Sequence, residues 1–341
     1  MIDFDSLSPD APAIILLCSS VGTDRSAGTA RPLGPRTWAK LAEGLRRQSF
    51  RGPRDLVGLS ADEIDRSLGV GVEEATRYFS LLARGGQLAF EIDRLRSRGI
   101  WVLTIADDAY PTRLADRLGV DAPPVLFGSG DASALDRGGI AIVGSREADD
   151  AAVAFTERLA SAAARGGTPV VSGGARGIDV SAMRAALAAG GTVIGVLPEG
   201  VERRLRDADT RVAVASGQVV LVSPYQPVAP FSAGAAMGRN KLIYALADVA
   251  VVVSSATGSG GTWTGALEAI KGGWVPVLIR DGEDVPDGNR ALIQKGGSSL
   301  PTKGFVAETV SVADLLGFAS VREQSVAETS APYEQQALFD E

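Results

Sequence analysis

The sequence predicts an α/β fold built on a doubly wound, mostly parallel sheet, with a small N-terminal helical domain. From about residue 99 onward, short runs rich in β-branched residues alternate with segments of helical periodicity. Such alternation is typical of parallel sheets whose helices cover both faces. Glycine-rich stretches follow several of these runs, at the edge where ligands bind in sheets of this kind. We therefore expect the functional site at the carboxyl ends of the strands.

Three regions follow from the pattern along the chain. Residues 1–95 are expected to form the helical domain, with one helix over 37–48 and a capping-box sequence, Ser60-Ala-Asp-Glu63, at the start of another. Residues 96–305 are expected to form the α/β core. Residues 306–341 lose the alternation, so we expect an acidic, mostly disordered tail with one short helix over 310–318.

The helical domain contains one stretch with a functional resemblance. Leu68-Gly-Val-Gly-Val-Glu-Glu-Ala75 resembles the hairpin of helix–hairpin–helix or SAM-like domains. In helix–hairpin–helix modules the backbone N–H groups of the Gly-x-Gly turn can hold a DNA phosphate. A packing role is at least as well supported here, because Glu73 and Glu74 would repel a phosphate.

The core elements are expected in alternating order. An extended segment over 122–127 enters the core, and residues 231–241 are expected to be a loop leading to a helix that ends near 247. The last clear strand is expected at 275–279. The remaining strands are expected over 100–105, 140–143, 168–171, 192–197, 219–222 and 249–253, and the helices over 149–165, 180–189, 207–216 and 263–271.

Composition narrows the classes of protein. The chain has 45% hydrophobic and 22% charged residues and no apolar run long enough to cross a bilayer. The apolar stretch Ala13–Cys18 follows acidic residues, so we expect no signal peptide and no membrane association. A single cysteine excludes an internal disulfide and is typical of a cytoplasmic protein. The absence of histidine excludes a Ser-His-Asp triad and argues against a zinc site, so no metal or cofactor is expected.

The net charge of −7 does not exclude a nucleic-acid ligand. Residues 307–341 contain seven acidic residues and only Arg322 as a base, which gives −6. The remaining 306 residues therefore sum to −1, from −7 minus −6. A local basic groove fits this distribution of charge.

The stretch Ser172-Gly-Gly-Ala-Arg-Gly-Ile-Asp179 lies between an expected strand and an expected helix. Glycine lets the backbone adopt positive φ and lets a ligand approach the main chain. The following helix offers unpaired N–H groups and a positive dipole end, and Arg176 adds a forked donor. These features suit an anion, usually phosphate. The alternative is an ordinary tight turn with an exposed arginine.

Four segments are expected to meet at the carboxyl edge of the sheet. All contain glycines, three supply an arginine, and none supplies a pair of carboxylates or a nucleophile with a base. Such a set of donors is typical of a phosphate-binding surface and not of a hydrolytic centre. The candidate residues are Ser145, Arg146, Gly173, Gly174, Arg176, Gly177, Arg239, Asn240, Lys241, Ser259, Gly260, Gly261 and Thr262.

The order of motifs resembles the DprA/Smf family (DNA-processing protein A) over about residues 100–300. The motifs are Asp108…Tyr110-Pro111, Pro123–Phe127, Ile142–Arg146, Ser172–Asp179, Arg239-Asn240 and Ser259-Gly260…Thr264. The resemblance implies an extended Rossmann-like core without an established reaction. It implies binding of single-stranded DNA, transfer to a RecA-type recombinase and, often, a homodimer. It assigns backbone phosphates to Arg146, Gly174, Arg176, Gly177, Arg239, Asn240, Ser259 and Gly260.

The sequence also departs from the family pattern. Met183 stands where the family usually has histidine, and Arg203-Arg204-Leu205-Arg206 occupies the region of a family Tyr-Pro. Phe231 lies eight residues before Arg239, so a base-stacking role for it is in doubt. These changes indicate a divergent branch, in recombination, repair or mobile-element defence.

Several alternatives stay open. A nucleotide-binding or nucleotide-cleaving enzyme related to the phosphoribohydrolases would carry Pro-Gly-Gly-x-Gly-Thr-x-x-Glu, but Gly265 stands at the glutamate position and Glu268 lies three residues later. A third alternative is a nucleotide-sensing or adaptor module. Arg146 could pair with Asp179, which could itself be a helix N-cap. Trp263 suits core packing better than base stacking, and the arginines at 203, 204 and 206 could extend the groove or form a solvated face.

The last residues contain a short motif of their own. Gln335-x-x-Leu338-Phe339 resembles the peptide by which bacterial polymerases and repair proteins enter the pocket of the sliding clamp. An apolar pair on a polar tether is typical of a docking peptide. The alternative is a chance match, since only three positions are fixed.

Overall fold

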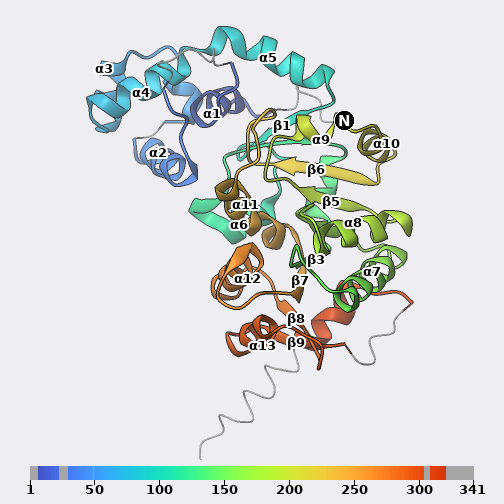
Figure 1. Cartoon of the computed structure of the whole chain (residues 1–341). Coiled ribbons are helices and arrows are strands. Elements are labelled where there is room, and N and C mark those ends of the chain that lie inside the picture. Colours follow the sequence, from blue (N-terminus) through green and yellow to red (C-terminus); the bar gives the residue numbers. More distant parts are fainter. Residues whose placement is uncertain (1–6, 23–29, 49, 303–307, 320–341) are drawn as a thin grey trace, which may run out of the picture.

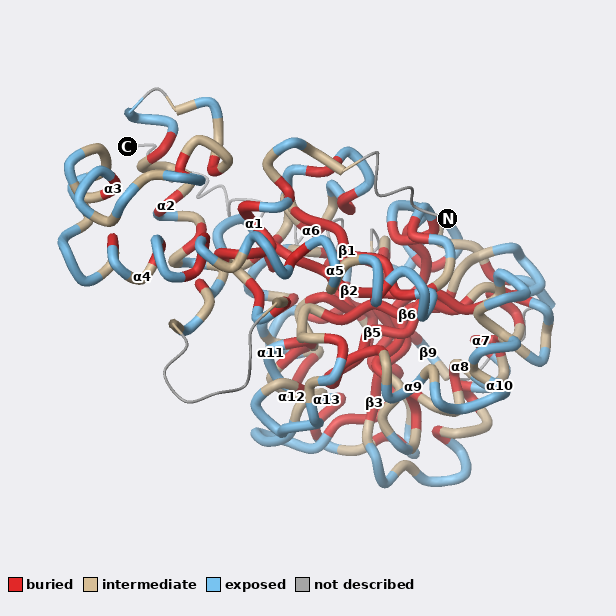
Figure 2. Tube along the Cα trace, turned by 90° about the horizontal axis from the view of Figure 1, so that it is seen from above, coloured by how far each residue is buried: buried red, intermediate tan, exposed pale blue. Residues whose placement is uncertain are grey.

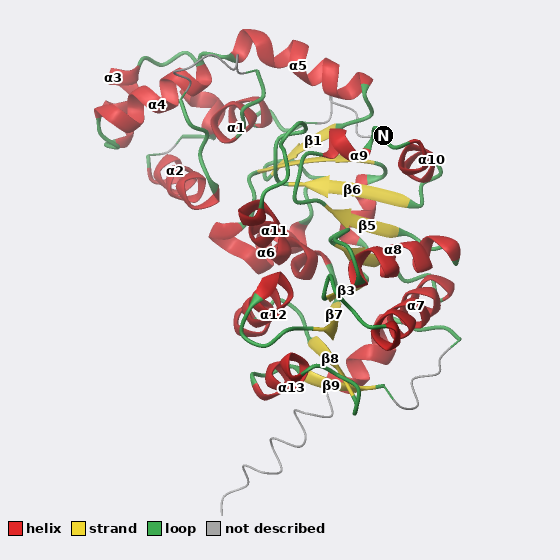
Figure 3. Cartoon of the chain, in the orientation of Figure 1, coloured by secondary structure: helices red, strands yellow, loops and turns green. Residues whose placement is uncertain are grey.

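The computed structural model describes residues 7–22, 30–48, 50–302 and 308–319. Within these ranges the chain forms one sheet of nine strands in the order β1-β2-β6-β5-β4-β3-β7-β8-β9, with helices on both faces (Figures 1 and 3). The predicted α/β class with a doubly wound, mostly parallel sheet is confirmed. The strands are β1 (Trp101–Thr104), β2 (Val125–Ser129), β3 (Ile140–Gly144), β4 (Val170–Ser172), β5 (Val193–Val196), β6 (Val219–Ser223), β7 (Val249–Ser254), β8 (Val277–Asp281) and β9 (Ser298–Pro301).

The strand order has one reversal, between β3 and β7. From β3 the chain winds outward through β4, β5 and β6, and it then returns to β7 on the other side of β3. These pairs, and β7–β8–β9, are parallel, whereas β1 pairs with β2 and β2 pairs with β6 in antiparallel register. The carboxyl ends of β3 and β7 therefore diverge into helices on opposite faces, which leaves a crevice suited to a ligand.

Two layers of helices bury the sheet. On one face α7 and α8 pack with Ile142, Val170 and Val251. On the other face α6, α11, α12 and α13 pack with Val143, Val171 and Val252. Because successive side chains point to opposite faces, the strands must be apolar throughout, as the sequence predicts. The core helices are α6 (Thr112–Leu118), α7 (Asp150–Arg165), α8 (Ile178–Ala188), α9 (Val201–Arg204), α10 (Ala208–Ala215), α11 (Ala233–Leu246), α12 (Gly260–Gly272) and α13 (Asp287–Gln294).

The N-terminal region is helical, as predicted. Its helices are α1 (Ala11–Cys18), α2 (Pro35–Arg47), α3 (Ala61–Leu68), α4 (Val72–Leu82) and α5 (Gly85–Ser97). Ser60 and Glu63 form the predicted capping box at the start of α3. Apolar residues of these helices, such as Ile14 and Leu81, belong to the same buried cluster as Val102 and Phe127 of the sheet. Figure 2 shows the helices beside the β1–β2 end of the sheet, with the most buried chain in the central strands.

One expected element was wrong, and one strand was missed. Residues 231–241 do not form a loop: α11 begins at Ala233, where the Ser232 side chain accepts a hydrogen bond from the N–H of Ala235. Three of the first four residues of α11 are alanine, the residue with the highest helix propensity, so the sequence favours helix here. Strand β9 was missed because Ser298–Pro301 is short and half polar, and it is held by parallel pairing with β8.

The end of the described chain packs on α7. The N–H of Val310 donates to the carbonyl of Ala162 at 3.0 Å, and Leu315 is fully buried. Residues 312–319 are helical, close to the expected 310–318. No helix in the described ranges is long and apolar enough to cross a membrane.

Candidate functional site

The loops after β3 and β4 are in close contact. The N–H of Ile178 donates to the carbonyl of Ser145 at 3.3 Å, and a side chain at Gly177 would overlap that carbonyl oxygen. Gly174 and Gly177 have φ of 67° and 79°, a region in which L side chains are strained. Glycine is therefore required here by the backbone and by the contact between loops, as the sequence predicts.

The buried carboxylate of Asp179 accepts hydrogen bonds from the backbone around these loops. Its side chain is 6% exposed and lies in the first turn of α8. Burial raises the pKa of the carboxyl to about 6, although nearby Arg239 and backbone N–H groups of Ala175, Gly144 and Gly173 lower it. Asp179 is not the N-cap of α8, because that position belongs to Gly177. Its basic neighbour is Arg239, whereas Arg146 is exposed.

Helix α11 supplies Arg239 and Asn240 to the same place. Arg239 is only 3% exposed, so this residue cannot serve as a surface contact. Nη1 of Arg239 lies against Gly173, where a Cβ would overlap it. The side-chain amide of Asn240 donates to the carbonyl of Gly261 at 3.0 Å and so ties α11 to α12.

Helix α12 points its N-terminus at the crevice between β3 and β7. Gly258 and Gly260 have positive φ, and Ser259 occupies the N-cap position without a side-chain cap bond among the described residues. The Thr262 hydroxyl donates to the carbonyl of Gly144 at 3.0 Å, which joins α12 to the end of β3. The glycine stretch therefore forms the N-cap and first turn of the helix, one turn earlier than expected.

Most of the candidate residues surround one pocket of about 400 Å³ at the reversal of strand order. Ala175 and Asp179 line it from the loop after β4. Exposed Arg146 and Glu147 give the mouth one charge of each sign. Gly173, Gly174, Arg176 and Gly177 form the adjoining loop and are not among the lining residues. Those that line the pocket are Ser145, Arg146, Arg239, Asn240, Ser259, Gly260, Gly261 and Thr262.

Lys241 lies apart from this pocket. It lines a neighbouring pocket of about 470 Å³ on the other side of α11, together with Arg36, Lys271 and Trp274. Arg36 comes from the N-terminal helices and pairs with Asp121 at 2.7 Å. Sequence reasoning missed this pocket, because no short-range pattern links residues some 200 positions apart.

Glu199 and Arg204 were also missed as a pair. Glu199 is 4% exposed and accepts from Nε of Arg204 at 3.0 Å. All three arginines at 203, 204 and 206 are exposed, and Nη2 of Arg204 lies 4.0 Å from the position that a Cβ at Gly174 would take. The pair of Glu199 and Arg204 therefore lies beside the loop that contains Gly174. Trp263 is half-buried against the core, which agrees with a packing role.

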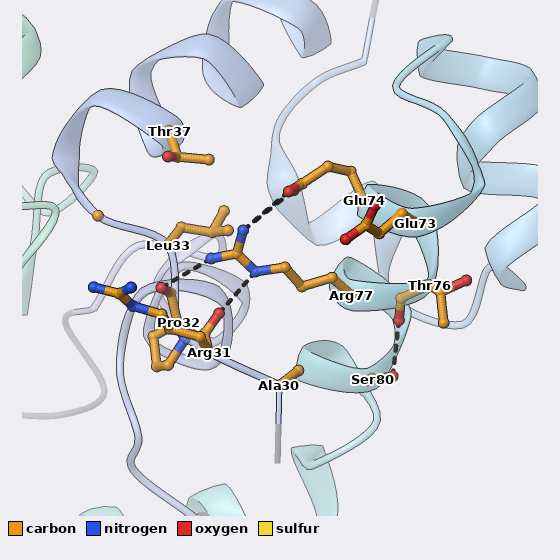
Figure 4. Close-up of a pocket in the computed structure, with 11 residues that line it drawn as sticks. Ala30, Arg31, Pro32, Leu33, Thr37, Glu73, Glu74, Thr76, Arg77 and Ser80 are labelled. Carbon is orange, nitrogen blue, oxygen red and sulfur yellow. Dashed lines mark hydrogen bonds and ion pairs between the residues drawn. The ribbon is translucent and has the colours of Figure 1, made fainter. Parts of the chain in front are cut away.

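The N-terminal hairpin offers less than its motif suggests. Gly69 and Gly71 form the turn between α3 and α4, but the N–H of Gly71 already donates to Asp65 at 2.7 Å. A pocket of about 800 Å³ lies beside α4 (Figure 4). There Arg77 donates hydrogen bonds to the carbonyls of Arg31 and Pro32 and to the carboxylate of Glu74.

Within the described ranges no cluster of acidic, Cys or His side chains could hold a metal ion.

Comparison with known proteins identifies the family. The model of the DNA recombination-mediator protein A family matches residues 101–311, more than half of the chain. The chain belongs to this family. It is 32% identical over 205 residues to DNA processing protein DprA of Streptococcus pneumoniae, a match that covers 59% of this chain and 71% of the relative. It is 30% identical over 211 residues to DprA of Bacillus subtilis, covering 60% and 69%.

A solved structure of the family has the same fold. The X-ray structure of S. pneumoniae DprA is 24% identical, covers 85% of this chain and 94% of its own, and has a TM-score of 0.63. A structure of Helicobacter pylori DprA, described for its single-stranded DNA binding mode, is 24% identical, covers 66% and 96%, and has a TM-score of 0.48. The matched region of the family model contains all four segments of the candidate site.

Proposed function

We propose that this DprA-family chain binds single-stranded DNA through its phosphate backbone at the carboxyl edge of the sheet. The observation that carries the proposal is the convergence of the four glycine-containing segments on one pocket at the reversal between β3 and β7. Exposed Arg146 and Arg176 stand on the loops around it. Backbone amides, a helix N-terminus and arginines attract phosphates without reading bases, so little sequence preference is expected.

Further functional properties are predicted from the sequence alone. They include transfer of the strand to a RecA-type recombinase, a homodimer and a cytoplasmic location. They also include the sliding clamp as a partner, although Gln335, Leu338 and Phe339 lie outside the described residues. All of these stay predictions.

Fewer observations support the alternative function, that of a nucleotide-cleaving enzyme. Glu268, the nearest equivalent of the hydrolase glutamate, is exposed on α12 and lines the neighbouring pocket that also contains Lys241. The carboxylates beside the main pocket, Asp179 and Glu199, are bound to backbone N–H groups and to Arg204. A general acid or base needs a free path to the substrate, which these contacts restrict.

The test is a fluorescence-anisotropy titration of oligo-dT and of a duplex of equal length over a range of salt concentrations. We expect tighter binding of the single strand, and we expect Arg146→Ala and Arg176→Ala each to make the salt slope shallower by roughly one unit. Arg137→Ala is the matched control. That arginine is also exposed but precedes β3, at the opposite edge of the sheet. Equal affinity and slope in all four proteins would refute the proposed groove.

A further inference from the structure

Arg239 is a buried cation with unused hydrogen-bond donors. Its side chain is 3% exposed, and Nε and Nη1 have no hydrogen-bond partner among the described residues. Burial lowers the pKa of the guanidinium, although Asp179 and Glu199 act in the opposite direction. An unpaired buried donor is unfavourable for a fold, because it loses its hydrogen bonds to water and gains none in return. Two such donors on one side chain therefore point to a ligand oxygen as their partner.

The nearby carboxylates are engaged elsewhere. Asp179 accepts hydrogen bonds from backbone N–H groups of Ala175, Gly144 and Gly173, and Glu199 accepts from Arg204. Neither carboxylate accepts a hydrogen bond from Nε or Nη1 of Arg239 in the described chain. The guanidinium thus keeps its capacity to bind an anion that enters the pocket.

The pocket around Arg239 is small. Its volume of about 400 Å³ is near the lower end of ligand pockets, with room for a single small ligand. The uncapped first turn of the 13-residue helix α12 forms part of its wall through Gly260, Gly261 and Thr262. Backbone N–H groups at this end and the helix dipole both favour an anion.

We propose that this pocket takes a phosphomonoester, the terminal phosphate of a DNA strand or of a mononucleotide, and not the phosphodiester of a continuous strand. A phosphate inside a strand has a nucleotide on each side. To reach a guanidinium this deeply buried, it would have to bring both nucleotides into a pocket that has room for one. A terminal phosphate brings only one nucleotide and carries a charge of about −1.5 to −2 at pH 7, which suits an unpaired arginine better than the single charge of a diester.

The inference for a DNA end rests on the proposed function, whereas the mononucleotide source does not. Exposed Arg146 and Arg176 would then hold the following backbone phosphates, and Arg239 would hold the end. The pocket would bind one terminal phosphate of each strand, and the surface arginines would add affinity by binding the phosphates along the strand.

The experiment measures the affinity of the full chain for internally labelled dT20 with a 5′-phosphate, with a 3′-phosphate, with neither, and as a closed circle. Thymidine monophosphate is titrated separately by calorimetry.

We expect one of the two phosphorylated strands, the 5′ or the 3′, to bind about tenfold tighter than the unphosphorylated strand and the circle. If no end is preferred but the mononucleotide binds through Arg239, the ligand is a nucleotide. Equal binding of all four oligonucleotides without mononucleotide binding overturns the inference but leaves the proposed function intact. Failure of every oligonucleotide to bind would instead refute the proposed function, and calorimetry alone would then decide the inference.

Two variants assign the effect to the pocket. Arg239→Met removes the charge at similar length, and its folding is checked by thermal melting. Ser259→Asp leaves Arg239 in place and puts a negative charge at the pocket, at an N-cap position where aspartate is well tolerated. Both should abolish the tenfold ratio or the mononucleotide binding. Ser216→Asp, an exposed position at the end of α10, is the matched control and should keep it. Retention of the ratio or of mononucleotide binding in a folded Arg239→Met or Ser259→Asp protein would overturn the assignment.

Discussion

Asp179 illustrates how one buried carboxyl can organise a binding loop. It accepts hydrogen bonds from the backbone N–H groups of Gly144, Gly173 and Ala175, while burial raises its pKa to about 6. The end of β3 and the loop after β4 thus share a single acceptor. Its position two residues after Gly177 places it under the loop and not at the helix cap. The local sequence could not reveal this role, because the same Gly-Ile-Asp pattern also suits a capping residue.

The raised pKa of Asp179 predicts a pH dependence of stability. The pKa of about 6 in the folded state exceeds the value of about 3.9 expected in the unfolded chain. The stability that this group contributes is therefore fully present below about pH 4 and is lost as the pH rises through about 6. Relative to Asp179→Asn, the wild-type free energy of unfolding should fall by on the order of 2–3 kcal/mol between pH 4 and pH 7. Denaturant melts across this range measure it, and a constant difference would contradict the assigned pKa.

At the scale of elements, the site depends on contacts that hold four segments together. Asn240 joins α11 to α12, Thr262 joins α12 to the end of β3, and the loop before α8 rests on the carbonyl of Ser145. Two candidate side chains of the pocket, Asn240 and Thr262, thus also hold the scaffold, whereas Arg146 and Arg176 take part in none of these three contacts. Helix and strand geometry thus fix where Arg146 and Arg176 stand.

Helix α8 offers a matched pair of glycines for testing this scaffold. Gly177 precedes the helix and Gly190 follows it, with φ of 79° and 80°. A Cβ at Gly177 would overlap the carbonyl of Ser145, whereas at Gly190 nothing lies within 4 Å. We expect Gly190→Ala to cost about 1 kcal/mol of stability and Gly177→Ala about 3 kcal/mol or more, with loss of DNA binding only in the latter. Equal costs in chemical denaturation would show that the contact between loops is not needed.

Much of this arrangement was predictable from the sequence. The periodic apolar runs predicted the parallel strands, and parallel strands place their following loops at one edge, so the glycine segments had to meet. Burial could not be predicted in the same way. Arg239 and Lys241 are two residues apart, yet the turn of α11 directs one into the main pocket and the other into its neighbour. Because a loop was expected over 231–241, the sequence could not assign Arg239 and Lys241 to different faces of a helix.

At the scale of the whole molecule, charge is distributed unevenly along the chain. Residues 307–341 carry most of the net negative charge, while the exposed arginines stand on the loops of the core. Such separation lets an acidic protein present a local cationic surface.

The terminal motif predicts a second partner for the whole protein. A labelled peptide of residues 331–341 should bind the cognate sliding clamp in the micromolar range, because the apolar pair Leu338-Phe339 would fill the clamp pocket. Leu338→Ala with Phe339→Ala should abolish binding in a fluorescence-anisotropy titration. Absence of binding by both the peptide and the full chain would exclude the clamp.

The shared cluster that joins the N-terminal helices to the sheet has a consequence for how the protein unfolds. Ile14 and Leu81 are buried with Val102 and Phe127, so neither part completes its interior alone. Cooperative melting is the expected behaviour of such a continuous interior, with one heat-absorption peak where separable domains would give two. Cleavage of the chain near residue 96 would expose a hydrophobic surface on each fragment, and both fragments would tend to aggregate.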